Sequence, residues 1–209
     1  MADRAVLLVE GKDDEHVFYA LLNHHGIPRT IRIKDKQGID NLLDTLEVEL
    51  LGSELNQLGI VVDADVDLTA RWQSLTAILR NSGYTKIPTS PEPDGTVIVE
   101  DDRPVVGIWI MPDNSVPGML ENFVRFLVPQ NDLLWDRVVF CIDNIPETER
   151  LFRSQHLIKA QIHTWLAWQQ EPGSPLGLSI TKRYLEADAP HARQLIEWIR
   201  RVFSISQTL

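Results

Sequence analysis

The chain has 209 residues, of which 44% are apolar and 24% are charged, which suits a globular domain with its own hydrophobic core and an appended segment. Its formal net charge of −10 argues against tight, non-specific nucleic-acid binding by this chain alone, because an acidic surface repels phosphate backbones. A nucleic-acid substrate stays open, since bound cations or a protein partner that supplies basic surface would offset the charge locally.

Two features bear on the cellular compartment. The single cysteine, Cys141, excludes an internal disulfide, and its apolar surroundings at 138–142 predict a buried side chain. The apolar run that follows residues 1–4 is too short for the core of a signal peptide, and no run reaches membrane-spanning length. We therefore expect a cytoplasmic protein with no membrane partner.

Strand-like and helix-like patterns alternate over the first 110 residues. Short apolar or alternating segments predict strands at 5–9, 31–34, 58–62, 96–99 and 105–110. Amphipathic segments predict three helices between them, with apolar faces made of Val17, Phe18, Leu21 and Leu22, then Ile39, Leu42, Leu43, Leu46 and Leu50, then Trp72, Leu75, Ile78 and Leu79. Asp13, Asp14 and Glu15 are expected to cap the first helix and fill its first turn. This alternation predicts an α/β fold with a mainly parallel sheet flanked by helices and a hairpin at 96–110.

The rest of the chain is expected to be a mostly helical extension with one short strand at 138–142. The Pro-Gly-Ser-Pro break at 172–175 separates a helix that carries Trp165 and Trp168 from a last helix around Trp198. His24 and His25 end the first helix, where a positive charge is favourable. Adjacent residues on a helix point apart, which argues against their sharing a metal ion.

Acidic residues follow two of the predicted strands. Glu10 comes directly after the first strand, and Asp63 and Asp65 come directly after the third. If those strands are neighbours, these carboxylates meet at one sheet edge, where close like charges are costly unless protonated or bridged by a cation. Hard oxygen ligands suit Mg²⁺ or Mn²⁺. The alternative is that Asp63 and Asp65 only end a strand and cap the next helix.

At these residues the sequence resembles the TOPRIM domain of topoisomerases, bacterial primases and nucleases of the overcoming-lysogenization-defect class. Val9-Glu10-Gly11 is similar to the first motif of the family, and the segment 63–67, Asp-Ala-Asp-Val-Asp, is similar to its Asp-x-Asp motif. The resemblance covers about residues 5–110. It implies that Glu10 is a general acid/base and metal ligand, that Asp63 and Asp65 are metal ligands, and that Asp67 lies behind them or contacts a second ion.

Departures from the family pattern narrow the expected activity. Leu68 stands where the topoisomerase motif has glycine, and Tyr19, Tyr84 and Tyr184 lack the setting of a strand-rejoining tyrosine. The chain is closer to the stand-alone TOPRIM proteins and the nuclease branch. Glu121 is then either a further metal ligand or a solvated helix residue.

Lys182 is open in the same way. It is either a phosphoryl-binding side chain, as in similar nucleases, or a surface lysine.

These observations predict a TOPRIM-like α/β domain at 1–128 and a helical extension at 129–209 packed on it. The expected activity is Mg²⁺- or Mn²⁺-dependent phosphodiester hydrolysis of DNA or RNA, catalysed by Glu10, Asp63 and Asp65, with Asp67 and Glu121 as further metal ligands. One alternative is a non-catalytic binding or regulatory subunit of a nucleic-acid-processing or defence assembly. Another is a receiver-like protein that accepts a phosphoryl group on Asp63. The substrate, the protein partner and the oligomeric state stay open at this point.

Overall fold

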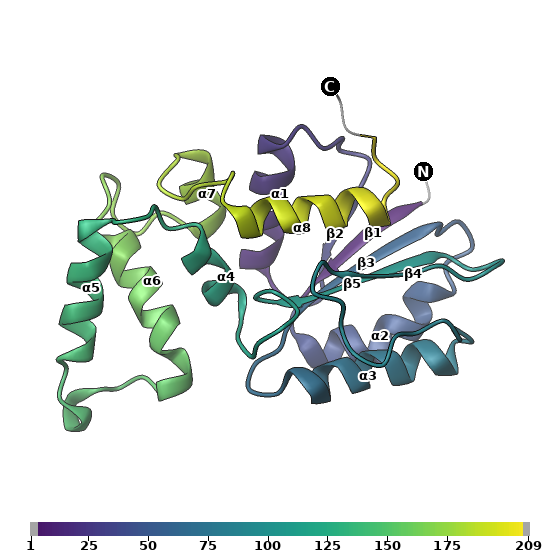
Figure 1. Cartoon of the computed structure of the whole chain (residues 1–209), viewed down its shortest axis with the longest axis horizontal. Coiled ribbons are helices and arrows are strands. Elements are labelled where there is room, and N and C mark those ends of the chain that lie inside the picture. The colour runs from purple at the N-terminus through teal and green to yellow at the C-terminus, as the bar shows by residue number, and fades with distance from the viewer. Residues whose placement is uncertain (1–3, 207–209) are drawn as a thin grey trace.

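A computed structural model describes residues 4–206 and has one five-stranded sheet flanked by helices (Figure 1). The strands are β1 (Ala5–Val9), β2 (Arg32–Asp35), β3 (Gln57–Asp63), β4 (Thr96–Ile98) and β5 (Val105–Met111). Their order is β2-β1-β3-β5-β4, in which β4 runs antiparallel to β5 and all other neighbours are parallel. The predicted α/β class, the mainly parallel sheet and the hairpin are confirmed.

Eight α-helices and two short 3₁₀ segments connect and follow the strands in the described part of the chain. They are α1 (Lys12–His24), α2 (Ile39–Leu50), α3 (Leu68–Asn81), α4 (Leu120–Phe126), α5 (Leu133–Asp143), η1 (Glu147–Glu149), η2 (Ser154–His156), α6 (Leu157–Ala167), α7 (Leu176–Thr181) and α8 (Pro190–Val202). The alternating side chains of the strands divide the core into two layers. Helices α2 and α3 cover one face of the sheet, and α1 and α8 cover the other.

Helix α8 closes the second face by packing directly on β5. Trp198 of α8 lies against Trp109 with 5.7 Å between ring centroids, and its indole N–H donates to the carbonyl of Thr96 at 3.1 Å. Gly107 permits this approach, because a Cβ atom placed there would lie 2.2 Å from Val202. A helix from the C-terminal region therefore covers part of the second face of the sheet.

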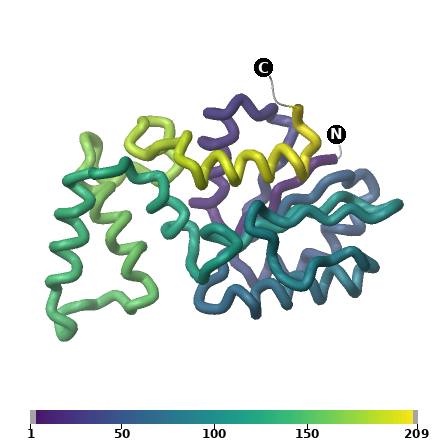
Figure 2. Tube along the Cα trace, viewed as in Figure 1, coloured from purple at the N-terminus to yellow at the C-terminus, as the bar shows by residue number. Residues whose placement is uncertain are grey.

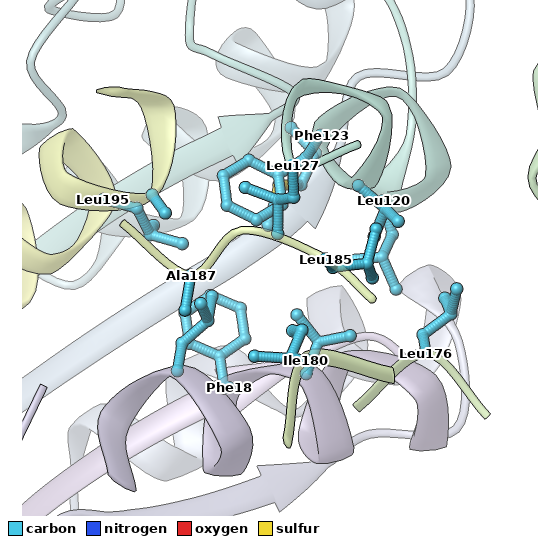
Figure 3. Close-up of a cluster of buried hydrophobic side chains, with 14 of the residues drawn as sticks. Phe18, Leu120, Phe123, Leu127, Leu176, Ile180, Leu185, Ala187 and Leu195 are labelled. Carbon is cyan, nitrogen blue, oxygen red and sulfur yellow. The ribbon is translucent and has the colours of Figure 1, made fainter. Parts of the chain in front are cut away.

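The helices after residue 128 share the core of the α/β region. Phe18 of α1 meets side chains of α4, α7, α8 and the segment between the last two in one buried cluster (Figure 3). Labelled members of this cluster are Leu120, Phe123, Leu127, Leu176, Ile180, Leu185, Ala187 and Leu195. Helices α5 and α6 pack against each other and extend to one side of the sheet (Figure 2). The predicted bounds of the α/β domain and the helical extension include residues 1–3 and 207–209, which lie outside the described residues.

The short strand predicted at 138–142 is wrong, because these residues lie within α5. An apolar run of this length fits a buried strand or a helix equally well by its local pattern. In the helix, Val138 and Ile142 are four residues apart and buried, whereas Phe140 and Cys141 face outward. The prediction that Cys141 is buried is therefore wrong as well.

No helix within residues 4–206 combines the length and the apolar character that crossing a bilayer requires.

Candidate active site

The parallel pairing of β1 with β3 brings Glu10 and Asp63 together. Leu8 pairs with Ile60, so the two strands end side by side and their carboxylates follow at the same sheet edge. An oxygen of Glu10, Oε1, accepts a hydrogen bond from the backbone N–H of Asp63 at 2.7 Å. The predicted meeting of these two residues is thus a consequence of the strand order.

Two further carboxylates come from helices that begin at the same edge. Asp14 lies in the first turn of α1 and is 8% exposed, and Glu121 lies in the first turn of α4 and is 3% exposed. Gly11 is the N-cap residue of α1 and no side chain caps the helix there, so the expected carboxylate cap is absent while the first-turn carboxylates are present.

These four acidic side chains line a cavity of about 400 Å³. Its lining residues are Glu10, Gly11, Lys12, Asp13, Asp14, Asp35, Gln37, Gly38, Asp63, Leu120, Glu121 and Lys159.

The cavity holds its carboxylates at unusual pKa values. Burial, with added repulsion from Asp14, Glu10 and Glu121, raises the pKa of Asp63 to about 9. Burial and the charge of Glu10 raise the pKa of Asp14 to about 7, and burial also raises the pKa of Glu10. Without a cation, the cavity therefore retains protons at neutral pH.

Fixed donors orient the cluster. The backbone N–H of Leu120, at the start of α4, donates to Oδ1 of Asp63 at 2.9 Å. Lys159 of α6 places its Nζ atom 2.8 Å from Oε1 of Glu121, and Nε2 of His163 lies 3.9 Å from the same oxygen. Burial opposes the charge on Lys159, but the hydrogen bond to Glu121 and the nearby negative charges together outweigh it and raise the pKa of the lysine. Helix α6 thus lends a positive charge to an otherwise acidic cavity.

Asp65 and Asp67 do not line this cavity. Asp65 has a backbone φ of 52°, and its side chain, 49% exposed, forms an ion pair with Nη2 of Arg71 at 2.8 Å. Asp67 caps α3 by accepting from the backbone N–H of Ala70 at 2.9 Å. The structure therefore gathers Glu10, Asp63 and Glu121 of the predicted set and directs Asp65 and Asp67 to neighbouring structural contacts.

Three functional candidates were missed in the sequence: Asp14, Arg71 and Lys159. Asp14 carried a signal, because it stands three and four residues before Val17 and Phe18 and so occupies a buried position of the helical period. Arg71 contacts two residues of the acidic segment 63–67. Its Nε donates to the carbonyl of Asp63 at 2.8 Å, and its Nη2 pairs with the carboxylate of Asp65. Lys159 had no local signal. Lys182 lies away from the cavity and pairs with Glu171 and Ser174.

The donor set fits a hard divalent cation held partly through water. Carboxylate oxygens are ligands that Mg²⁺ and Mn²⁺ accept, and Mg²⁺ usually keeps several of its water molecules. Among residues 4–206, the only three His, Cys, Asp or Glu side chains with ligand atoms all within 4.8 Å are His24, His25 and Asp188. No three of the cavity carboxylates meet this spacing among the described residues, so direct contact of one ion with three of them would require their side chains to move.

The model of one protein family matches residues 4–204, which is nearly the entire chain. The chain belongs to this family. It carries the description "Protein of unknown function (DUF3226)". No curated protein and no solved structure matches the chain. The match to DUF3226 spans both the α/β region and the helical extension, so the cavity and the lysine that α6 brings to it lie within the family's boundaries.

Proposed function

We propose that this chain is a TOPRIM-like, Mg²⁺- or Mn²⁺-dependent hydrolase that cleaves phosphodiester bonds in nucleic acid, with the acidic cavity as its active site. The observation that carries the proposal is the burial of Asp63 beside Glu10, Asp14 and Glu121 where parallel strands end. Close, buried like charges oppose folding unless a proton or a cation compensates them. A cluster of this kind is a costly feature that metal binding explains.

The residues of the cavity divide the work. A bound divalent ion would supply an activated water molecule and charge for the phosphate oxygens. Glu10 would take the proton from the attacking water, and burial raises the pKa of this carboxyl, which makes it a better proton acceptor. Asp63 and Asp14 would hold the ion, and as ligands they would have to be deprotonated.

Lys159 places a positive charge in the cavity of a chain whose net charge is negative. Its ammonium group reaches the cavity from α6 and pairs there with Glu121. A phosphate group of a substrate carries the same charge as Glu121 and can share or replace that pairing. Local recognition of phosphate is therefore compatible with a chain whose formal net charge is −10.

Two of the metal-ligand roles stay predictions from the sequence. The sequence predicts Asp65 and Asp67 as metal ligands. In the structure, the side chain of Asp65 pairs with Arg71, and that of Asp67 caps α3. The proposal also places the protein in the cytoplasm, where nucleic acid and Mg²⁺ are both present. A protein partner with a basic surface would add phosphate contacts to those that Lys159 alone supplies.

A cleavage assay with matched variants tests the proposal. The full chain is incubated with single- and double-stranded DNA and RNA at low salt, with Mg²⁺ or Mn²⁺. Glu10→Gln should slow cleavage by about 10²–10⁴-fold, which is the usual worth of a positioned proton acceptor. Lys159→Ala should also slow it, whereas Lys182→Ala, a lysine outside the cavity, should not.

Each failure points to a different conclusion. Equal effects of Lys159→Ala and Lys182→Ala would remove the phosphate-binding role from α6. A wild-type chain that binds Mn²⁺ but cleaves none of the four substrates, alone or with co-purifying proteins, would contradict the enzyme. In that case the non-catalytic binding subunit would take its place.

A further inference from the structure

A group of side chains that could hold a metal ion lies away from the acidic cavity, at the other end of α1. It consists of His24, His25 and Asp188, whose ligand atoms all lie within 4.8 Å of one another. Nε2 of His24 is 3.0 Å from Oδ2 of Asp188, although the two residues are 164 positions apart in the chain. The two imidazole rings meet edge to face with 4.9 Å between centroids.

The end of the helix explains why the adjacent histidines converge. Within a helix, neighbouring side chains point apart, which is why the sequence argued against a shared ion. His24 is the last residue of α1, but His25 is the C-cap residue, with φ −87° and ψ 11°, so it already leaves the helical path. Nε2 of His25 contacts the carbonyl oxygen of Ala187 at 2.9 Å, which holds this ring beside Asp188.

The chemistry of the group differs from that of the acidic cavity. Two imidazoles and one carboxylate are the ligands of borderline metals such as Zn²⁺, whereas Mg²⁺ prefers oxygen alone. His24 and Asp188 are partly exposed, so water can fill the remaining coordination position. Arg193 lies close enough to help lower the pKa of Asp188, after the larger effect of His24. This positive charge opposes the binding of any cation, so the coordination bonds to the imidazoles and the carboxylate have to outweigh it.

A metal ion bound to this group would link two parts of the fold that are far apart in the sequence. Ala187 and Asp188 belong to the segment that leads into α8, the helix that closes one face of the sheet. Arg200 of α8 also reaches this point, where its Nη2 donates to the carbonyl of His25 at 3.3 Å. Three hydrogen-bonded contacts between α1 and the C-terminal region thus meet at the two histidines.

We propose that His24, His25 and Asp188 form a Zn²⁺ site that fastens the end of α1 to the segment preceding α8. The metal replaces the direct contact between His24 and Asp188 and adds a ligand bond from His25. Binding to the native chain alone stabilises it by mass action. The site is independent of the acidic cavity and of any catalytic activity there.

Titration of the full chain, free of any histidine tag, with Zn²⁺ tests this proposal. Calorimetry in a phosphate-free buffer should find a Zn²⁺ equivalent whose affinity falls at least tenfold in His24→Ala and in Asp188→Asn, since even supporting contacts of metal ligands are worth about 10–100-fold. His156→Ala is the matched control, because His156 lies in η2 outside the group and should leave the affinity unchanged. Zn²⁺ should raise the melting temperature of the wild type but not of Asp188→Asn.

A fourth variant separates this site from the cavity. Glu10→Gln should retain the Zn²⁺ equivalent, and Co²⁺ bound in its place should give a visible absorption band that Asp188→Asn loses. Equal Zn²⁺ affinity in Asp188→Asn and His156→Ala would overturn the proposal. So would loss of the Zn²⁺ equivalent in Glu10→Gln, because the ion would then belong to the carboxylates.

Discussion

The buried acid of Asp63 makes the stability of the cation-free protein depend on pH. Its pKa is about 9 in the folded chain against an ordinary value of 3.8, so between these values the folded state binds one more proton than the unfolded state. The stability that this proton contributes is fully present below pH 3.8 and is lost as the pH rises toward 9. The free energy of unfolding therefore falls by about 1.4 kcal/mol per pH unit from this group within that window.

Asp63→Asn should remove this dependence without disturbing the fold. The amide cannot ionise, and its oxygen can still accept the hydrogen bond from the N–H of Leu120. Asp14, with a pKa of about 7, contributes mainly below neutral pH, so the interval from pH 7 to pH 8 isolates Asp63. Over that interval the wild type should lose about 1.4 kcal/mol more than the variant, or roughly 3–5 °C in melting temperature for a chain of this size.

Urea denaturation at pH 7.0, 7.5 and 8.0 in the presence of EDTA measures the effect. Asp44→Asn, a change at an exposed position of α2, is the matched control and should keep the slope of the wild type. At pH 8 and without metal, Asp63→Asn should be at least as stable as the wild type. Equal slopes for the wild type and Asp63→Asn would show that the carboxyl of Asp63 ionises normally, and the argument for a compensated cluster would fail.

Three further predictions concern the metal, the chemistry of Asp63 and the packing of α8. Mg²⁺ or Mn²⁺ should raise the melting temperature, by the equivalent of about 2.7 kcal/mol at a hundredfold excess over Kd, and the response should be weaker in Asp63→Asn; a melting curve indifferent to both ions would count against the site. Acetyl phosphate with Mg²⁺ should leave the intact mass unchanged, and a gain of one phosphoryl group that Asp63→Asn abolishes would favour the phosphoacceptor alternative. Gly107→Ala should cost about 1–3 kcal/mol in urea denaturation, because the new methyl group meets Val202, and adding Val202→Ala should recover part of that loss; an unchanged stability of Gly107→Ala would contradict this packing.

Much of the fold could be predicted because its signals are local. The run at 5–9 is apolar on both faces of the chain, as a strand buried between two helical layers requires, and it forms the inner strand β1. The apolar positions of α1 recur at helical spacing and are buried as expected. Glu10 and Asp63 were identified for the same reason, since each follows a recognisable strand and parallel strands end at a common edge.

The rest depended on contacts between distant segments. Residues 138–142 carry an apolar pattern that fits two structures, and only the packing of α5 on α6 selects the helix. Lys159 enters the acidic cavity because α6 lies against α4, and no spacing in the sequence records that contact. His24 and Asp188 meet across 164 positions for the same reason. Periodicity and local hydrogen bonding depend on residues that are close in the sequence. The partner that a charged side chain meets depends on how distant helices and strands pack together.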